Sequence, residues 1–392
     1  MFPVAALTET IGDGSLDIYS WNLAGAFRKY FPNRVQIITT DVSRKSADVW
    51  GVPSGGVEAQ EAADRTQQFI RRLEVEVQVG CPVHVSNQHM ARYALLLDRP
   101  FIVTDHDAMA RAWDSVDAGH TPYIAKPNER DACLLGQDIG GINASVHVIT
   151  VSHLSKCDLQ MRWGIPSEKI SVVYEGINTG IFRPPRERFK LDGPYILFVA
   201  TEDWRKNIEV VLRALRHAKH VLGLKNLHLV KVGEAGSGGR VEGGPRSNTL
   251  RLMQELGLKE AEDVIFTGYV PQSELPSLYA GALALIHPSW YEGFGFPPLE
   301  AMACGGVAIV SEGTALEEIS GPASLVAHPD DYEGIARMIQ LLHEDSAFRG
   351  ELVAKGAQHT KLFTWRSTAA KTLEVYAMVQ ERLKVSAPTR VR

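Results

Sequence analysis

The stretch His287–Glu300 reads HPSWYEGFGFPPLE and follows a short apolar run, 282–286. That run has the length of a buried strand. The residues that follow the two prolines, LEAMACG, have a helix-like composition, and Gly305 is a plausible end of the helix. We expect Pro298 at the first helical position, where its missing N–H costs nothing. The sequence therefore predicts a strand, a glycine-containing turn and a helix.

The residues of this turn suggest a binding site. The free N–H groups at a helix start favour an anion. Gly293 and Gly295 allow the backbone to approach a ligand closely. Glu292 and Glu300 bracket the turn and could accept hydrogen bonds from hydroxyl groups. Phosphate and hydroxyl binding together suit a nucleotide-sugar. Spacing alone leaves a second interpretation open, a structural strand–turn–helix with two solvated glutamates.

The stretch resembles the E-x7-E signature of the retaining glycosyltransferases of family 4, roughly PS-x-x-EGFG-x-PPLEAMACG-x-P. It departs at Phe296 and Val307, where Leu and Pro are usual. The resemblance implies an α/β chain with the GT-B fold, in which two Rossmann-like domains enclose a donor cleft. The implied domains are an N-terminal acceptor domain over 1–183, a nucleotide-sugar donor domain over 194–365, and a helix over 366–385 that crosses back.

Bulk properties agree with a globular protein of two domains. The chain has 392 residues, of which 45% are hydrophobic and 22% charged. A net charge of -5 gives no general reason to expect a nucleic acid as partner. Four scattered cysteines without a C-x-x-C pair argue against a zinc site or disulfide framework. We expect a cytoplasmic protein, since no signal peptide or spanning apolar run is recognised.

The N-terminal region predicts a βαβ unit, with strands over 3–8 and 35–40 around a helix over 16–30. Gly12 and Gly14 lie between the first strand and the helix. They could bring backbone N–H groups toward a phosphate, or they could simply form a tight turn. In the family that this chain resembles, a glycine loop here lies under the donor diphosphate. Asp17 stands where the third glycine of a G-x-G-x-x-G fingerprint would fall, which argues against a dinucleotide-dependent dehydrogenase.

A later strand, over 101–104, ends in polar residues that include His106. Ligands bind at the carboxyl ends of parallel strands, and a histidine titrates near neutral pH. A structural histidine is the alternative. The family's HD motif, whose histidine lines the donor-sugar pocket, makes His106 a catalytic candidate. We also expect a helix over 91–97, whereas 109–142 shows little periodicity.

The segment 164–184 resembles the family's strand-and-hinge segment, in which Gly176 would place its backbone close to the donor. Here Glu175 replaces a frequent Asn. The interdomain linker is expected over 182–193.

The second half begins with a strong strand over 195–199, followed by Arg205 and Lys206 at a helix start. Two cations there could clamp a diphosphate and stabilise a leaving group, although solvated cations are the ordinary alternative. The resemblance to the family's G-T-x-x-x-RKN segment favours the clamp. Further on, the strand and turn around Tyr269 and Val270 correspond to the family's nucleobase-holding segment, which acts through main-chain groups.

The resemblance thus implies a set of roles. Glu300 would accept from the ribose hydroxyls, and Glu292 with the amides of Phe294 and Gly295 would hold the donor sugar. The two cations would neutralise the diphosphate as the glycosidic bond breaks. No cofactor and no metal is expected, since no DxD at a strand end qualifies as a metal site.

The donor is expected to be a GDP- or UDP-hexose, with a preference for GDP-mannose because TxxxRKN, TGYV and LYAGA resemble the mannosyl-transferring members. The acceptor would be a glycan, a lipid-linked sugar or a small metabolite. Weak peripheral membrane contact and the oligomeric state stay open. Two alternatives remain, a sugar phosphorylase of similar fold and a catalytically inactive sugar-binding protein.

Overall fold

The computed structural model describes residues 4–10, 15–40, 57–107, 129–235 and 244–386. These residues form two compact units. The first unit takes the described residues up to 107 together with 129–176 and 365–386, and the second takes those within 177–364. Among the described residues, the chain passes from the first unit to the second after residue 176 and returns to the first at residue 365.

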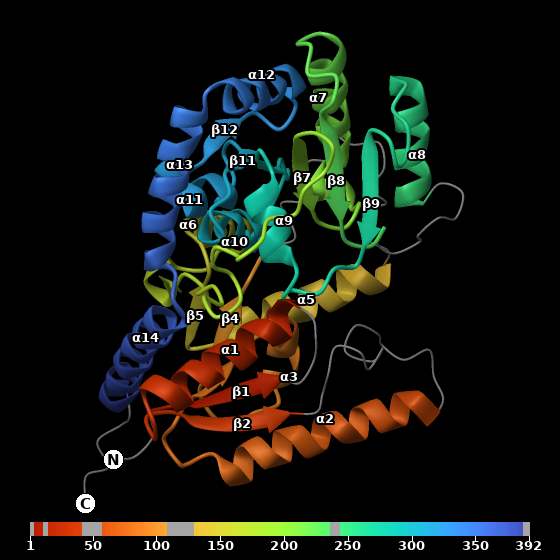
Figure 1. The fold of residues 1–392 in the computed structure, drawn as a ribbon. Coiled ribbons are helices and arrows are strands. Elements are labelled where there is room, and N and C mark those ends of the chain that lie inside the picture. The colour runs from red at the N-terminus through yellow and green to blue at the C-terminus, as the bar shows by residue number, and fades with distance from the viewer. Residues whose placement is uncertain (1–3, 11–14, 41–56, 108–128, 236–243, 387–392) are drawn as a thin grey trace, which may run out of the picture. The chain divides into compact units, whose positions relative to one another are not determined.

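The first unit is built on a parallel six-stranded sheet of order β2-β1-β3-β4-β5-β6 (Figure 1). Its strands are β1 Ala6–Thr10, β2 Gln36–Thr40, β3 Val83–Val85, β4 Phe101–Asp105, β5 His147–Thr150 and β6 Ile170–Val172. Its helices are α1 Ser15–Tyr30, α2 Val57–Glu76, α3 Ala91–Ala94, α5 Glu129–Ala144, α6 His153–Trp163 and α14 Trp365–Ser386. Parallel strands need crossover connections, which these helices supply.

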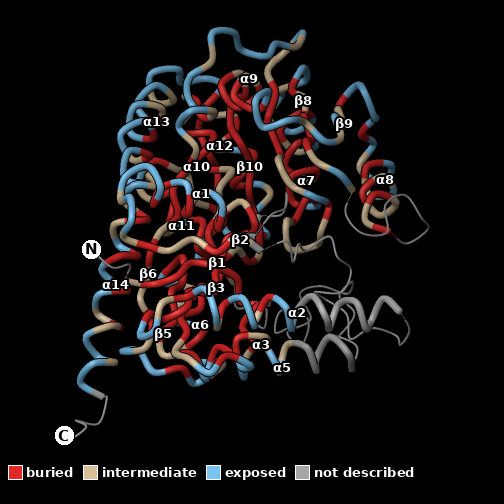
Figure 2. Tube along the Cα trace, turned by 90° about the horizontal axis from the view of Figure 1, so that it is seen from below, coloured by how far each residue is buried: buried red, intermediate tan, exposed pale blue. Residues whose placement is uncertain are grey.

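Both faces of this sheet are covered. Side chains alternate along β4, so that Phe101 and Val103 join the core formed with α2, α3 and α5, whereas Ile102 joins the core formed with α1 and α14. The Tyr376 hydroxyl on α14 lies 2.6 Å from Nδ1 of His84 on β3. Figure 2 shows the strands as buried and much of the helix surface as exposed.

Two helices of the first unit differ from the sequence prediction. The helix expected over 91–97 ends at Ala94, because the chain tightens there into turns, with Leu96 N–H donating to Tyr93 O at 3.0 Å. Helix α5 occupies part of the region where no periodicity was recognised. Its Gly141 packs so closely on α3 that an added Cβ would lie 2.3 Å from the Ala91 carbonyl oxygen. The contact therefore requires glycine at a position where a helical apolar pattern would have a hydrophobic side chain.

The second unit also contains a parallel six-stranded sheet, of order β12-β11-β10-β7-β8-β9. Its strands are β7 Tyr195–Val199, β8 His228–Val232, β9 Val264–Gly268, β10 Leu285–His287, β11 Ala308–Ser311 and β12 Leu325–Ala327. Its helices are α7 Ile208–His220, α8 Pro245–Leu256, α9 Leu275–Gly281, α10 Phe296–Ala303, α11 Ala315–Ser320, α12 Tyr332–Glu344 and α13 Ser346–His359.

The strand order of this second sheet reverses at β7. Strands β8 and β9 extend the sheet on one side, and β10 then pairs with β7 on the other. In open α/β sheets, ligands bind outside the carboxyl ends of the strands at such a switch point. The topology therefore predicts a ligand site at the loops that follow β7 and β10.

The segment 182–193, expected as a linker, forms no helix or strand. It is nonetheless packed on the second unit. Phe182 is buried in a cluster with Tyr195, and Phe189 N–H donates to Ser277 O at 3.0 Å.

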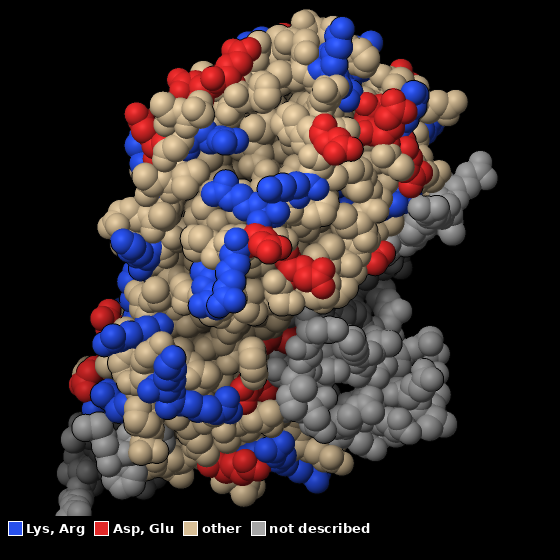
Figure 3. All heavy atoms as spheres, viewed as in Figure 1, with Lys and Arg blue, Asp and Glu red and all other residues tan. Residues whose placement is uncertain are grey.

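Charge is mixed on one face of the described protein. On the face drawn in Figure 3, the described residues place acidic and basic side chains near one another rather than in two separate fields. None of the described helices is both long enough and apolar enough to cross a bilayer.

Candidate functional site

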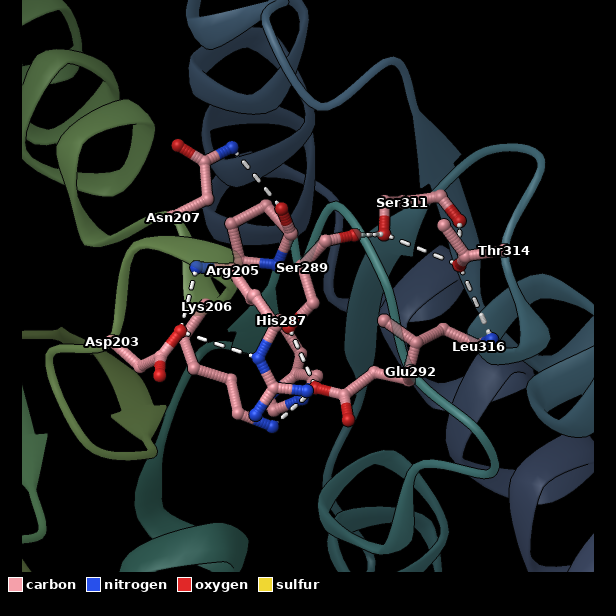
Figure 4. A network of polar contacts seen from close by, with 11 residues as sticks. Asp203, Arg205, Lys206, Asn207, His287, Ser289, Glu292, Ser311, Thr314 and Leu316 are labelled. Carbon is pink, nitrogen blue, oxygen red and sulfur yellow. Dashed lines mark hydrogen bonds and ion pairs between the residues drawn. The ribbon is translucent and has the colours of Figure 1, made fainter. Parts of the chain in front are cut away.

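The loops after β7 and β10 meet through one ion pair. Lys206 Nζ lies 2.5 Å from Oε1 of Glu292, although the two residues are 86 positions apart. The side chains are 19% and 12% exposed, so water reaches the pair only partly. The structure therefore brings together two of the residues that the sequence suggested (Figure 4).

Two further donors converge on the same carboxylate oxygen. Ser289 Oγ donates to Glu292 Oε1 at 2.8 Å, and His287 Nε2 lies 3.1 Å from it. Burial lowers the pKa of His287, and the carboxylate only partly offsets this effect. A neutral His287 that donates through Nε2 leaves its Nδ1 as an acceptor, and this buried atom has no partner in the part of the chain that the structure describes.

Glu292 is held in its charged form. Burial alone would raise its pKa, but the positive charge of Lys206 and the hydrogen bond from His287 outweigh burial, and the pKa lies well below its usual range. Arg205 contributes in the same direction. Glu292 is thus a carboxylate at neutral pH.

Backbone contacts fix the two loops against each other. Asn207 adopts a left-handed conformation with φ of 56°, and its Nδ2 donates to Pro288 O at 3.1 Å and Pro329 O at 2.8 Å. Trp290 N–H donates to Arg205 O at 2.8 Å. Asn is among the few residues that tolerate this conformation, so the Asn of the RKN segment positions the neighbouring Lys206.

Arg205 lies beside the pair rather than within it. Its Nε is 3.3 Å from Asp203 Oδ1, and its side chain is 19% exposed. Asp203 also caps the short turn by accepting from Arg205 N–H at 3.0 Å. The guanidinium is therefore oriented by its own turn and adds positive charge near Glu292.

The turn before α10 requires glycine at position 295. Gly295 has φ of +103°, and an added Cβ would lie 2.3 Å from Leu316 Cδ2. Gly293 and Phe294 are both buried, and the Phe294 ring packs on Phe296 and Phe363 with centroids 5.3 and 6.1 Å away.

Helix α10 begins at Phe296, directly after this glycine. The expectation that Pro298 occupies the first helical position was therefore wrong, since the third helical residue is Pro298. The left-handed Gly295 acts as the N-cap and starts the helix two residues earlier.

Glu300 lies in a different environment. It is 9% exposed, and its Oε2 accepts from the Tyr279 hydroxyl at 2.8 Å. Burial raises the pKa of Glu300 to about 7, against the smaller lowering by this hydrogen bond. Neither Glu292 nor Glu300 is a solvated side chain, so the interpretation of the turn as a structural element with two solvated glutamates was wrong.

The predicted base-holding residues follow β9. Tyr269 is 73% exposed, and its N–H donates to Glu234 Oε1 at 3.3 Å. Val270 packs against the cluster that contains Phe182 and Leu275.

In the first unit, His106 follows β4 and is buried. Its Nδ1 is 2.9 Å from Glu175 Oε1 and its Nε2 is 3.0 Å from Ser86 O. Since a carboxylate and a carbonyl both accept, both ring nitrogens carry hydrogen. Burial opposes this charged form, but Glu175 outweighs burial and raises the pKa of His106. The expected free donor to a sugar hydroxyl is thus already engaged.

Other expected residues of the first unit are less informative. Gly176 is buried at the end of its segment of the first unit. Gly12 and Gly14 lie outside the described residues. The carboxyl group of Asp105 is fully buried and has no hydrogen-bond partner among the described residues, and burial raises its pKa to about 8.

Sequence reasoning missed four side chains of these networks. His287 and Ser289 lie inside the quoted stretch, and their spacing from Glu292 across a turn could have suggested contact. Tyr279 and Glu175 gave no local signal, although Glu175 was recognised as a departure from the family pattern.

Two family patterns match this chain in succession. The pattern described as Glycosyltransferase Family 4 matches residues 19–180, and the pattern described as Glycosyl transferases group 1 matches residues 182–359. The chain belongs to glycosyltransferase family 4. The two matches reach into both units, and the second includes the Lys206–Glu292 pair.

Similar proteins include mannosyltransferases. The chain is 32% identical to the O-antigen chain mannosyltransferase B of Escherichia coli over 241 residues, or 59% of this chain and 60% of that protein. It is 31% identical to the MMP alpha-(1->4)-mannosyltransferase of Mycolicibacterium hassiacum over 235 residues, or 58% of this chain and 53% of that protein. The family 4 chain thus spans less than two thirds of these relatives.

Solved structures share the fold. The sucrose-phosphate synthase of Thermosynechococcus elongatus matches with a TM-score of 0.74 and 20% identity, over 97% of this chain and 100% of that chain. Anabaena HepE in complex with UDP-glucose matches with a TM-score of 0.69 and 15% identity, over 95% and 99%. The expected GT-B class, with two Rossmann-like α/β domains, is confirmed for this family 4 chain.

Proposed function

We propose that this protein transfers a hexose from a nucleotide-sugar to a hydroxyl group of a glycan, a lipid-linked sugar or a small metabolite. The observation that carries the proposal is the Lys206–Glu292 pair at the switch point of the second sheet. The Lys206 ammonium group, 2.5 Å from the Glu292 carboxylate, can bind a phosphate, and the carboxylate can accept a hydrogen bond from a sugar hydroxyl. The two groups thus suit the two parts of one nucleotide-sugar.

In the proposed reaction, the bond between the anomeric carbon and the phosphate oxygen breaks and that oxygen keeps the electron pair. Lys206 and Arg205 stabilise the charge that develops there, which is where preorganised cations contribute most. Lys206 donates one of its three hydrogens to Glu292 and has others to offer.

The acceptor oxygen then bonds to the same carbon, and its proton passes to the departing phosphate oxygen. Attack from the face that the leaving group vacates would retain the anomeric configuration. The test of retention is the configuration of the first product formed, followed by NMR before the anomers equilibrate.

Glu292 keeps its charge and therefore suits the hydroxyl groups of the donor sugar. Glu300, which is ionised only above about pH 7, suits the two ribose hydroxyls. The main chain at Tyr269 and Val270 would hold the base. The names of the mannosyltransferase relatives, together with the TxxxRKN, TGYV and LYAGA segments, support GDP-mannose over a UDP-hexose.

The experiment is thermal unfolding of the purified protein with GDP, UDP or ADP at one concentration. A ligand at 100 times its dissociation constant adds about 2.7 kcal/mol to the stability of the folded state. We expect a rise in melting temperature with GDP or UDP. If none of the three raises it, the transferase proposal fails, and phosphate-dependent cleavage of a disaccharide becomes the next assay because a phosphorylase uses free phosphate.

A catalytically inactive sugar-binding protein predicts binding without chemistry. Slow hydrolysis of the bound nucleotide-sugar, measured as released nucleotide, separates the two. Release above the uncatalysed rate supports the transferase, and its complete absence with a bound donor contradicts it.

A further inference from the structure

The carboxyl ends of β8 and β9 place a carboxylate next to a backbone donor. Glu234 follows β8 and Tyr269 follows β9, and these strands are neighbours in the sheet (Figure 1). Tyr269 N–H donates to Glu234 Oε1 at 3.3 Å. The family resemblance assigns a role to the main chain of Tyr269 but none to Glu234.

A buried cluster of three charged side chains, Lys231, Glu202 and Arg246, fixes the backbone of Glu234. Lys231 Nζ donates to Gly233 O at 2.6 Å and to Glu234 O at 2.9 Å. The Lys231 side chain is 0% exposed, and Glu202 lies 3.1 Å from its ammonium group. Arg246 in turn donates to Glu202 at 2.6 Å. Burying three charges is costly, and here the lysine uses two of its hydrogens to fix one turn.

The two loops are also tied to each other. Gly233 N–H donates to Gly268 O at 2.8 Å. Gly233 has φ of +107°, and an added Cβ would lie 2.7 Å from Ala200 O, so glycine is required there. The relative position of Glu234 and Tyr269 is therefore set by main-chain bonds rather than by chance contact of two surface side chains.

Both residues of this edge reach solvent in the part of the chain that the structure describes. The Glu234 side chain is exposed, and the Tyr269 ring is 73% exposed. A planar base could stack on such a ring while its edge faces the donor and the acceptor.

The order of donor and acceptor distinguishes the bases. Guanine presents, in sequence, the O6 acceptor, the N1–H donor and the exocyclic N2 donors. When the base binds, Tyr269 N–H would exchange Glu234 Oε1 for O6, and the two oxygens of Glu234 would then accept from N1–H and N2–H. Uracil presents an acceptor, one donor and a second acceptor, so that a carbonyl oxygen would face the carboxylate.

We propose that Glu234, together with the Tyr269 amide, selects guanine, so that the donor is a guanosine-diphosphate sugar. This inference rests on the proposed function, because it assumes that a nucleotide occupies this edge of the second sheet.

The test is calorimetric titration of the full chain with GDP, IDP and UDP. IDP lacks only the exocyclic amine of guanine. A bidentate contact of this kind discriminates about 10- to 100-fold, and we expect GDP to bind more tightly than IDP and UDP by that factor. Glu234→Gln should remove the preference for GDP over IDP, since the amide NH₂ now faces the N2 donors.

Glu262→Gln is the matched control. Glu262 is an exposed glutamate that precedes β9, at the other end of the same strand. This variant should keep the wild-type preference for GDP. Urea unfolding of both variants checks that each remains folded.

The outcomes separate the two proposals. UDP binding more tightly than GDP, or a GDP preference that survives Glu234→Gln, would overturn the guanine inference and leave the transferase proposal standing. No binding of any of the three nucleotides would overturn both.

Discussion

Glu292 and Glu300 belong to one motif, eight positions apart, yet the structure gives them opposite environments. Three donors converge on one oxygen of Glu292, and the pKa of that carboxyl is held low. Glu300 has a single described hydrogen bond, from Tyr279, and burial raises its pKa to about 7. Two glutamates of the same motif are thus different chemical groups.

The difference suggests two ways of preparing a carboxylate for a polar ligand. Glu292 is already ionised and paired before any ligand arrives. Glu300 has one described donor, Tyr279, so hydroxyl groups of a ligand would supply further hydrogen bonds that burial has taken from water. Substitutions at these two glutamates and at the residues that contact them test this contrast.

Removing the cation should have the largest effect. Lys206→Ala takes away the charge that would stabilise a leaving phosphate, and we expect turnover to fall about 100- to 1,000-fold. Lys355→Ala, at an exposed lysine of α13, is the control and should be neutral. Near-normal steady-state turnover in Lys206→Ala, with the fold intact by circular dichroism, would remove this lysine from the mechanism.

Neutralising Glu292 should destabilise the protein. Glu292→Gln leaves the partly buried Lys206 without its counter-charge, and breaking such a pair costs about 3 kcal/mol. The free energy of unfolding, measured by urea titration at pH 7, checks this value. A loss below about 0.5 kcal/mol, as for exposed pairs, would mean that solvent screens the pair.

The same substitution at Glu300 should stabilise the protein above neutral pH instead of destabilising it. The pKa of Glu300 is about 7 in the folded protein against a usual 4.5, so the folded state binds more protons in that window and its stability falls as pH rises from about 4.5 to 7. Glu300→Gln removes this fall.

The two proteins should therefore differ little at pH 4.5, and the variant should be more stable at pH 8 by up to about 3 kcal/mol. The measurement is the urea-derived free energy of unfolding at several pH values. Parallel curves for wild type and Glu300→Gln would show that Glu300 is not the group that titrates.

The smallest effect is expected from Tyr279→Phe, which removes the one described donor to Glu300. A neutral hydrogen bond contributes about 1 kcal/mol, so the pKa of Glu300 should rise by about half to one unit. Nucleotide affinity, if it requires the ionised carboxylate, weakens as pH falls through about 7 in wild type and at a higher pH in the variant. Calorimetric titration across pH 6–9 would detect the shift, and identical profiles would contradict it.

Local patterns predicted the backbone better than the side-chain environment. The strand before Glu292, the glycine turn and the cations after β7 were all readable from the sequence, because periodicity and turn residues are local. The pairing of Lys206 with Glu292, and of His106 with Glu175, spans 86 and 69 positions. Such contacts, and the burial that sets each pKa, depend on the assembled sheets and leave no trace in local spacing.

Helix α14 has a consequence for the order in which the parts of the first unit are made during synthesis. The second unit ends at residue 364, whereas the first unit needs α14 to complete the face of its core that α1 also covers, and for the contact of Tyr376 with His84, 292 positions earlier. At about 5–20 residues per second, a ribosome takes about 15–60 s to make the intervening chain. The first unit therefore waits with part of an apolar face uncovered until the second unit has been made, and we expect chaperones to recognise this part of the nascent chain.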